Sequence, residues 1–201
     1  MRDMPSGKQT GKHIVIEEPA LNKIYLNYPR HVCVVGSSWQ DIVNFMPASW
    51  NSPISFSPPV IGVAISPERF TFGLVARSKI MSISYFHFNS WEKIDFLGKF
   101  SGKDINKVEK LRLRFFNGLK NSAPIPEDAI ISFECDVIDM REYGDHHWVV
   151  GKILNAYYLP DFAVIDDNII NPRLPYFKPV LYFGRKRYTT IIDRVFTPER
   201  K

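Results

Sequence analysis

Short runs of β-branched and aromatic residues, separated by prolines and glycines, dominate the pattern of hydrophobic positions along the chain. Runs of this kind are typical of strands. The run at residues 60–65 ends at Ser66 and Pro67 and predicts a central strand. Gly144 and Asp145 separate two longer runs and predict the turn of a hairpin. The predicted extended segments are residues 31–35, 60–65, 80–88, 129–140, 146–158 and 179–183.

Helical patterns are restricted to short segments. Thr71 is a good N-cap and predicts a helix over residues 72–78. Residues 91–97 and 104–116 also suit helices, and in the second segment the apolar positions recur near helical spacing. Residues 37–59 are rich in serine, asparagine and proline, and we expect a loop with at most edge-like extended pieces, since proline removes backbone donors. The chain is therefore predicted to be mainly β, a barrel with a few short helices.

Composition places the chain among globular proteins. It has 201 residues, of which 45% are hydrophobic and 23% are charged, enough for one domain with a buried core. The longest apolar run is about six residues, whereas a membrane helix needs about 20, so we expect no membrane span. The start of the chain is polar and shows no secretory signal, which makes the cytoplasm the expected location. The expected divisions are a leader (1–12), one domain (13–190) and a basic tail (191–201).

The net charge of +5 is concentrated at the two ends of the chain. Residues 14–184 are close to neutral, whereas a nucleic-acid binder usually spreads lysine and arginine over a working face. A barrel that binds single-stranded nucleic acid is therefore kept only as a disfavoured alternative. Cys33 and Cys135 lie far apart in apolar stretches, so we expect two reduced core thiols rather than a zinc or dithiol site.

Several familiar motifs are absent from the sequence. It contains neither a GxGxxG fingerprint nor a GxSxG nucleophile elbow. Residues 98–104 have the wrong glycine spacing for a phosphate loop, and Asp104 stands where magnesium would need a hydroxyl. His146 and His147 are adjacent in a predicted strand and would point to opposite faces, so we expect no metal site.

Seven short motifs follow one another between Tyr28 and Tyr188. They are Tyr28-Pro29-Arg30; Asn44-Phe45-Met46-Pro47-Ala48-Ser49-Trp50; Ser57-Pro58-Pro59 with the strand after it; Arg69-Phe70-Thr71; Phe96-Leu97-Gly98 with Ser101-Gly102-Lys103-Asp104 and Lys107; Gly144-Asp145-His146; and Tyr182-Phe183-Gly184. In this order they resemble the flavin reductase-like family, the FMN-binding split-barrel proteins that include flavoredoxin and the reductase partners of two-component monooxygenases. The resemblance implies a split β-barrel of the Greek-key type.

The resemblance also implies an FMN site. Arg69 would offer its fork of donors to the phosphate, and Thr71 a hydroxyl at a helix N-terminus. Small residues after Met46 would let backbone amides approach the ring. The alternatives are a surface arginine, a plain N-cap, a core tryptophan at Trp50 and, for His146, a role in fixing the turn. The implied positions are Asn44, Met46, Pro47, Ala48, Ser49, Trp50, Asn51, Ser52, Arg69, Thr71, Lys107 and His146.

Three further basic segments lie at or near the positions that the resemblance implies. Lys99 and Lys103 are nearby alternatives to Lys107. Ser78-Lys79-Ile80-Met81 departs from the family pattern, and Arg77 and Lys79 are expected to add positive charge near the phosphate end. The basic triplet 185–187 adjoins the last predicted strand, so we expect it to line a groove of a partner subunit.

The function that the resemblance implies is that of an oxidoreductase. The protein would accept a hydride from NAD(P)H at flavin N5 and pass electrons to a flavin, oxygen, ferric ion or a protein acceptor such as a monooxygenase. No side chain is expected to act as an acid, base or covalent catalyst in the hydride step, because orientation and electrostatics suffice. A homodimer is implied. The alternative within the same family is a flavin-binding electron carrier without NAD(P)H activity.

Overall fold

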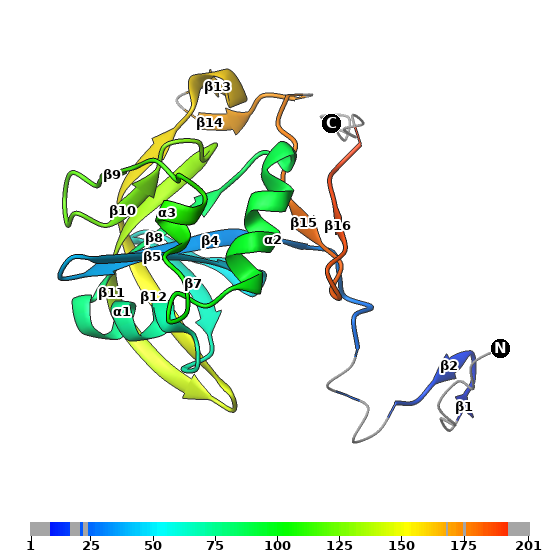
Figure 1. Ribbon diagram of the computed structural model, residues 1–201. Helices are drawn as coiled ribbons and strands as arrows, with labels where there is room; N and C mark the ends of the chain where they lie inside the picture. Colours follow the sequence, from blue (N-terminus) through cyan, green and yellow to red (C-terminus); the bar gives the residue numbers. More distant parts are fainter. Residues whose placement is uncertain (1–8, 17–20, 22–23, 168, 175, 193–201) are drawn as a thin grey trace.

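A seven-stranded antiparallel sheet forms the centre of the protein (Figure 1). The computed structural model describes residues 9–16, 21, 24–167, 169–174 and 176–192. The strand order is β5-β4-β8-β11-β12-β7-β6, so neighbours in the sheet are often distant in sequence. The strands are β4 (Cys33–Trp39), β5 (Ile42–Ala48), β6 (Asn51–Phe56), β7 (Pro59–Ile65), β8 (Ile80–Tyr85), β11 (Ile131–Tyr143) and β12 (His146–Tyr158).

Short helices and small two- or three-stranded sheets lie outside this central sheet, and the β1–β2 sheet lies apart from the body (Figure 1). The helices are α1 (Phe70–Ser78), α2 (Trp91–Lys99) and α3 (Lys107–Lys110), with 3-10 turns at Phe88–Ser90 and Pro160–Phe162. The other strands are β1 (Gln9–Thr10), β2 (His13–Ile14), β3 (Arg30–His31), β9 (Phe115–Asn117), β10 (Pro124–Pro126), β13 (Ala163–Asp166), β14 (Ile169–Pro172), β15 (Leu181–Tyr182) and β16 (Tyr188–Thr189). A mainly β fold with a few short helices is therefore confirmed.

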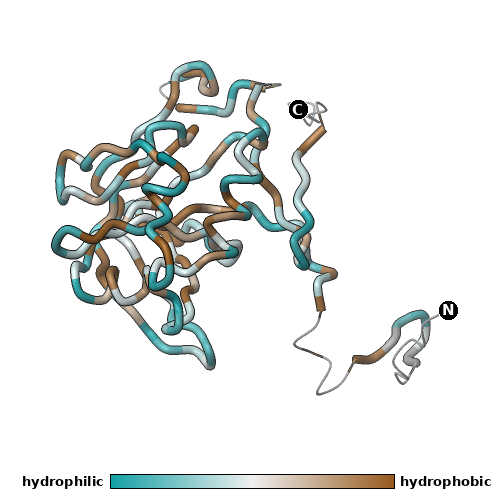
Figure 2. The backbone as a smooth tube through the Cα atoms, in the orientation of Figure 1, coloured by the Kyte–Doolittle hydropathy of each residue, from teal (hydrophilic) through white to brown (hydrophobic). Residues whose placement is uncertain are grey.

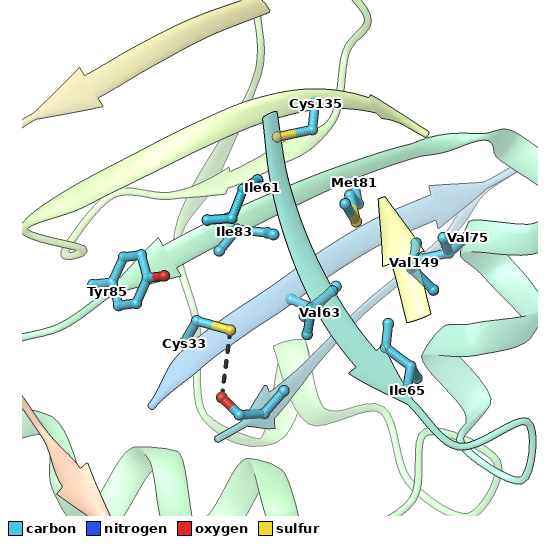
Figure 3. Packing of buried hydrophobic residues seen from close by; sticks show 12 residues of the cluster. Cys33, Ile61, Val63, Ile65, Val75, Met81, Ile83, Tyr85, Cys135 and Val149 are labelled. Carbon is cyan, nitrogen blue, oxygen red and sulfur yellow. Dashed lines mark hydrogen bonds between the residues drawn. The ribbon is translucent and has the colours of Figure 1, made fainter. Parts of the chain in front are cut away.

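The core lies on both faces of the central sheet. Val63, Ile83 and Val149 belong to one buried cluster, which Figure 3 shows converging between the strands. The second cluster lies under α2 and includes Phe45 and Phe86. In Figure 2 the tip of the β11–β12 hairpin is hydrophilic, while hydrophobic stretches run through the body. Alternation of apolar and polar residues along the strands accounts for this separation.

Both cysteines lie in the core as free thiols, as the sequence predicted. The Cys33 thiol donates to the Ala48 carbonyl oxygen at 3.4 Å (Figure 3). Burial raises the pKa of this thiol to about 12. Since the thiolate is the reactive form, the Cys33 thiol is chemically inert at neutral pH.

The segment from residue 37 to 59 is not a loop, and that prediction is wrong. It forms β5 and β6, which are the two edge strands of the central sheet. Pro47 and Pro53 lie in these strands, and an edge strand tolerates proline because one side of its backbone has no strand to pair with. The expected edge-like extended pieces are present, but they are longer than expected.

The predicted helix over residues 104–116 is also wrong. Only Lys107–Lys110 is helical, and Arg112 adopts a left-handed backbone conformation with φ 48° directly after it. Phe115–Asn117 then pairs as β9 with β10. Apolar residues in this region pack on the second core cluster from an irregular path, and this produces a spacing that resembles a helix.

The other predicted elements are present with shifted ends. The helix over 72–78 begins at Phe70, and Arg69, not Thr71, takes the N-cap position. The β11–β12 hairpin turns at Gly144 and Asp145 as predicted. Residues 1–8 and 193–201 lie outside the described residues, so the division into leader, domain and tail stays a prediction. Among the described residues, no helix is long and apolar enough to span a membrane.

One buried carboxylate serves the fold. Glu134 of β11 accepts hydrogen bonds from the backbone N–H groups of Lys120 and Asn121 and from the side chains of Asn155 and Tyr157. Burial alone would raise the pKa of Glu134, but these four donors outweigh it and hold the pKa below its ordinary value. The carboxylate thus fixes the loop before β10 on the long hairpin.

Candidate functional site

Three adjoining cavities surround the junction between β5 and β6, with volumes of about 350, 330 and 260 Å³. Pro47 and Arg69 line all three, so the cavities form one continuous groove. The first, which we call the α1 cavity, lies at the start of α1 and is also lined by Asn44, Thr71 and Lys107. The last, the Trp50 cavity, is lined by Trp50 and His146.

Arg69 brings a positive charge to the α1 cavity. Its guanidinium makes no ion pair with any carboxylate of the described residues. It precedes the first turn of a helix, where backbone N–H groups lack partners within the helix. Thr71 in that turn is buried, and its hydroxyl oxygen accepts a hydrogen bond of 2.7 Å from Asn44 Nδ2. This bond ties α1 to β5.

Lys107 adds a further positive charge to this cavity, which Lys99 also lines. It is 3% exposed, and its ammonium donates to the Leu97 carbonyl oxygen at 2.9 Å. Burial and, to a lesser degree, the charge of Arg69 lower the pKa of Lys107 to about 8. Asn106 caps the short helix in which Lys107 lies by accepting from the Glu109 N–H. The lining of the cavity thus includes three cations, Arg69, Lys99 and Lys107, two carboxylates, Glu68 and Asp104, and a helix start, and its net positive charge suits an anion.

Aromatic rings line the other end of the groove. Trp50 is 49% exposed, and its indole N–H donates to the Tyr28 hydroxyl at 2.8 Å. The His146 ring lies 4.9 Å from the Trp50 ring, between centroids. His146 Nδ1 is 2.7 Å from the Asp145 carboxylate, and this contact holds the pKa of Asp145 below its ordinary range. A half-exposed tryptophan rules out the alternative of a core residue.

The two adjacent histidines point in opposite directions, as predicted. His146 faces Trp50, whereas the ring of His147 lies 4.8 Å from Phe72 of α1. Among the described residues, no group of three or more histidines, cysteines or carboxylates could hold a metal ion.

Ten of the twelve expected site residues line the groove, and Asn51 and Ser52 do not. The Asn51 amide is fully used: it donates to the His31 and Ala48 carbonyl oxygens and accepts from the Tyr85 hydroxyl. Ser52 donates to the Pro53 carbonyl oxygen. Both residues line a separate cavity on the other side of Trp50.

Arg77 and Lys79 do not lie near the start of α1, and that expectation is wrong. Arg77 is in the last turn of α1, and Lys79 is its C-cap residue. The Lys79 ammonium contacts the Met140 sulfur at 3.6 Å. The two residues follow Arg69 closely in sequence, but the helix carries them to its opposite end.

Further residues line the groove beside Arg69: Lys99, which the sequence offered as an alternative to Lys107, and Tyr182 and Lys186. Lys186 belongs to the basic triplet expected to line a groove, and here it does so within its own chain. Gly98 and Gly102 could have indicated that their segment lies against the site. A Cβ at Gly102 would lie 2.5 Å from Asn44 Oδ1, so only glycine allows this close approach. The segment rejected as a phosphate loop is therefore a wall of the groove.

Comparison with known proteins gives consistent matches. A family model described as the flavin reductase like domain matches residues 25–191. An uncharacterised protein of Aeropyrum pernix is 31% identical over 174 residues, which are 86% of this chain and 64% of that protein. This chain therefore spans less than two thirds of that relative.

Solved structures agree with the family match. The FMN-binding protein of Thermus thermophilus, solved with bound 1-cyclohex-2-enone, is 29% identical with a TM-score of 0.78, covering 97% of this chain and all of that one. Flavoredoxin from Methanosarcina acetivorans has a TM-score of 0.80 at 22% identity, covering 94% of this chain and 96% of that one, which shows the fold alone. The predicted split-barrel fold is confirmed by these neighbours.

Lys107→Met is expected to stabilise the ligand-free chain near neutral pH, because it removes a charge held in a buried place. The lowered pKa of Lys107 corresponds to about 3 kcal/mol of destabilisation at the most. Between pH 8 and 10.5 the folded chain releases this proton before the unfolded chain does, so the wild type gains stability and the difference shrinks.

Urea unfolding of both proteins across this pH range measures the effect. Lys103→Met removes an exposed ammonium nearby and serves as the control for loss of charge. If the difference in unfolding free energy between Lys107→Met and wild type stays constant with pH, the result contradicts a buried charge at Lys107.

Proposed function

The chain belongs to the flavin reductase-like domain family, and from this premise we propose that it binds FMN and uses NAD(P)H as the electron donor. Family membership and the solved neighbours support a flavin-binding oxidoreductase. One observation carries the proposal of a flavin phosphate at this site. Arg69 and Lys107 face the α1 cavity without a carboxylate in ion-pair contact among the described residues.

The α1 cavity fits a phosphate monoester. Such a group carries close to two negative charges at neutral pH, and the cavity lining, with three cations against two carboxylates, attracts it. Arg69 would bind it through paired N–H donors, and Lys107 through the ammonium protons that Leu97 does not use. Asn44 would act indirectly by holding Thr71 at the helix start.

The remainder of the groove suits the ring system. Met46, Ala48 and Ser49 line it with small or flexible side chains, which let a planar ligand approach the backbone. Trp50 and His146 supply aromatic surface beside it. When bound, FMN supplies the redox chemistry, taking a hydride from NAD(P)H and passing electrons to an acceptor.

The residues of the chain then bind and orient rather than exchange protons. Trp50 is held by Tyr28, and His146 by Asp145, so both rings have fixed positions at the mouth of the cavity. Fixed aromatic surfaces position two flat reactants against each other, and this positioning lowers the barrier to hydride transfer. The acceptors we propose remain a flavin, oxygen, ferric ion or a protein such as a monooxygenase.

Replacement of Arg69 by glutamine is expected to weaken FMN binding about tenfold or more, since charge-assisted hydrogen bonds to the phosphate are lost. Binding of riboflavin, which lacks the phosphate, should change little. Titration followed by flavin fluorescence measures both affinities. Arg77→Gln removes the same charge at the far end of α1 and is the matched control. Equal weakening of FMN and riboflavin would contradict a phosphate contact at Arg69.

Anaerobic mixing of the FMN-loaded chain with NADH or NADPH tests the oxidoreductase function. The yellow absorbance of the flavin is expected to bleach with at least one of the two. If dithionite bleaches it and neither nicotinamide does, the chain is a flavin-binding electron carrier, and the NAD(P)H proposal fails.

We also propose a homodimer formed through the face that carries β6. Ile54 and Phe56 of this edge strand are exposed, Phe56 to 95%. Exposed apolar side chains on an unpaired edge are typical of an interface.

Sedimentation velocity is expected to give twice the mass of the chain, and Phe56→Ser is expected to shift the equilibrium toward the monomer. Val164→Ser, on the remote hairpin β13–β14, is the control, and an unchanged dimer in Phe56→Ser would refute this face.

A further inference from the structure

A fourth cavity of about 340 Å³ lies next to the proposed flavin groove and shares Tyr25, Tyr28 and Trp50 with the Trp50 cavity. We call it the Arg30 cavity. No role in binding FMN is proposed for it, because the phosphate end of the groove lies with Arg69 and Lys107. Its volume is within the range of small-molecule sites. Its described lining residues are Ile24, Tyr25, Asn27, Tyr28, Arg30, Trp50, Asn51, Ser52 and Trp148.

Four aromatic side chains give the Arg30 cavity flat apolar walls. Tyr25 and Tyr28 are in contact, with ring centroids 5.2 Å apart and planes tilted by 58°. Trp148 packs against the bare backbone of Gly62, where any side chain would overlap its indole. Tyr25 lies in the same way against Gly184, which has a positive φ of 83°. These walls are shaped for a planar ring.

Arg30 supplies the charge. It is the one charged residue among the described residues that line this cavity. No carboxylate of the described part of the chain is in ion-pair contact with it. Its guanidinium lies 5.9 Å from the centre of the Tyr28 ring, and its backbone is held by pairing with Tyr182 of β15. The guanidinium is thus positioned beside an aromatic wall and is free to bind an anion.

The other polar groups of the cavity are largely occupied. The Asn51 amide and the Ser52 hydroxyl donate to backbone carbonyls, and the Trp50 indole donates to Tyr28. The Tyr28 oxygen accepts that bond, and its own proton makes no hydrogen bond among the described residues. Recognition of a polar ligand group therefore depends on Arg30, with Tyr28 and the Asn27 amide as further hydrogen-bonding groups.

We propose that the Arg30 cavity binds a planar aromatic molecule that carries an anionic group. The ring lies among Tyr25, Trp50 and Trp148, and the anion pairs with Arg30. Two sources share this chemistry: an aromatic carboxylate, and a nucleotide whose phosphate is placed beside its base. Because Trp50 forms a wall of both cavities, a molecule bound here lies beside the proposed flavin groove, on the side opposite the phosphate end.

Isothermal titration calorimetry of the full chain, with and without added FMN, tests the proposal. The probes are naphthalene-2-carboxylate and adenosine 2′-phosphate, each compared with its neutral counterpart, naphthalene-2-carboxamide or adenosine. At least one anion is expected to bind at millimolar concentration or below, about tenfold more tightly than its neutral counterpart, as one charge-assisted contact implies. Arg30→Gln should abolish this preference, and Arg77→Gln should retain it.

The two arms separate the sources. Saturable, Arg30-dependent binding of the naphthoate supports a carboxylate ligand, and the same behaviour of the nucleotide supports a nucleotide ligand. Absence of binding by both anions overturns the proposal, as does equal binding of anions and neutral analogues, or unchanged binding by Arg30→Gln. Measurement on the FMN-free chain separates a failure here from a failure of flavin binding, which the colour of the protein reports independently.

Discussion

The site depends on two positive charges, Arg69 and Lys107, which the fold holds at one cavity without carboxylate partners in ion-pair contact among the described residues. This arrangement costs stability, since burial and mutual repulsion lower the pKa of Lys107. The fold sustains it through ordinary contacts: Leu97 accepts from Lys107, and Asn44 anchors the start of α1. Destabilising charge of this kind is typical of ligand sites, where binding relieves it.

The open edges of the sheet place the site. β5 and β6 are at opposite ends of the strand order, yet they are joined by Ser49 and Trp50, and the Ala64 N–H donates to the Trp50 carbonyl oxygen. The curved sheet thus brings its two ends together around this junction. Each cavity of the groove is lined by the end of β5, by the residues that join it to β6, or by both. The long β11–β12 hairpin then delivers His146 to the mouth.

Trp50 separates two cavities of different charge chemistry. On one side, Arg69 and Lys107 suit a dianionic phosphate at a distance from the ring; on the other, Arg30 suits a single anion beside an aromatic face. Tyr28 fixes the indole from the second side and His146 packs on it from the first. A half-exposed tryptophan that is held by Tyr28 and His146 can form a common wall for two planar molecules. This suits a protein whose proposed chemistry brings two flat reactants together.

The sequence alone determined the mainly β class, the hairpin at Gly144–Asp145, the buried thiols and the set of motifs that carry Arg69, Thr71 and His146, because strand patterns and turns are local properties. It misjudged the proline-rich segment, since only the sheet order shows that β5 and β6 are edges. It also could not place Arg77 and Lys79, which a helix carries away from Arg69, or Arg30 and Lys186, which distant segments bring beside Trp50 and Arg69. Those placements depend on long-range strand pairing and side-chain packing, which spacing along the chain does not encode.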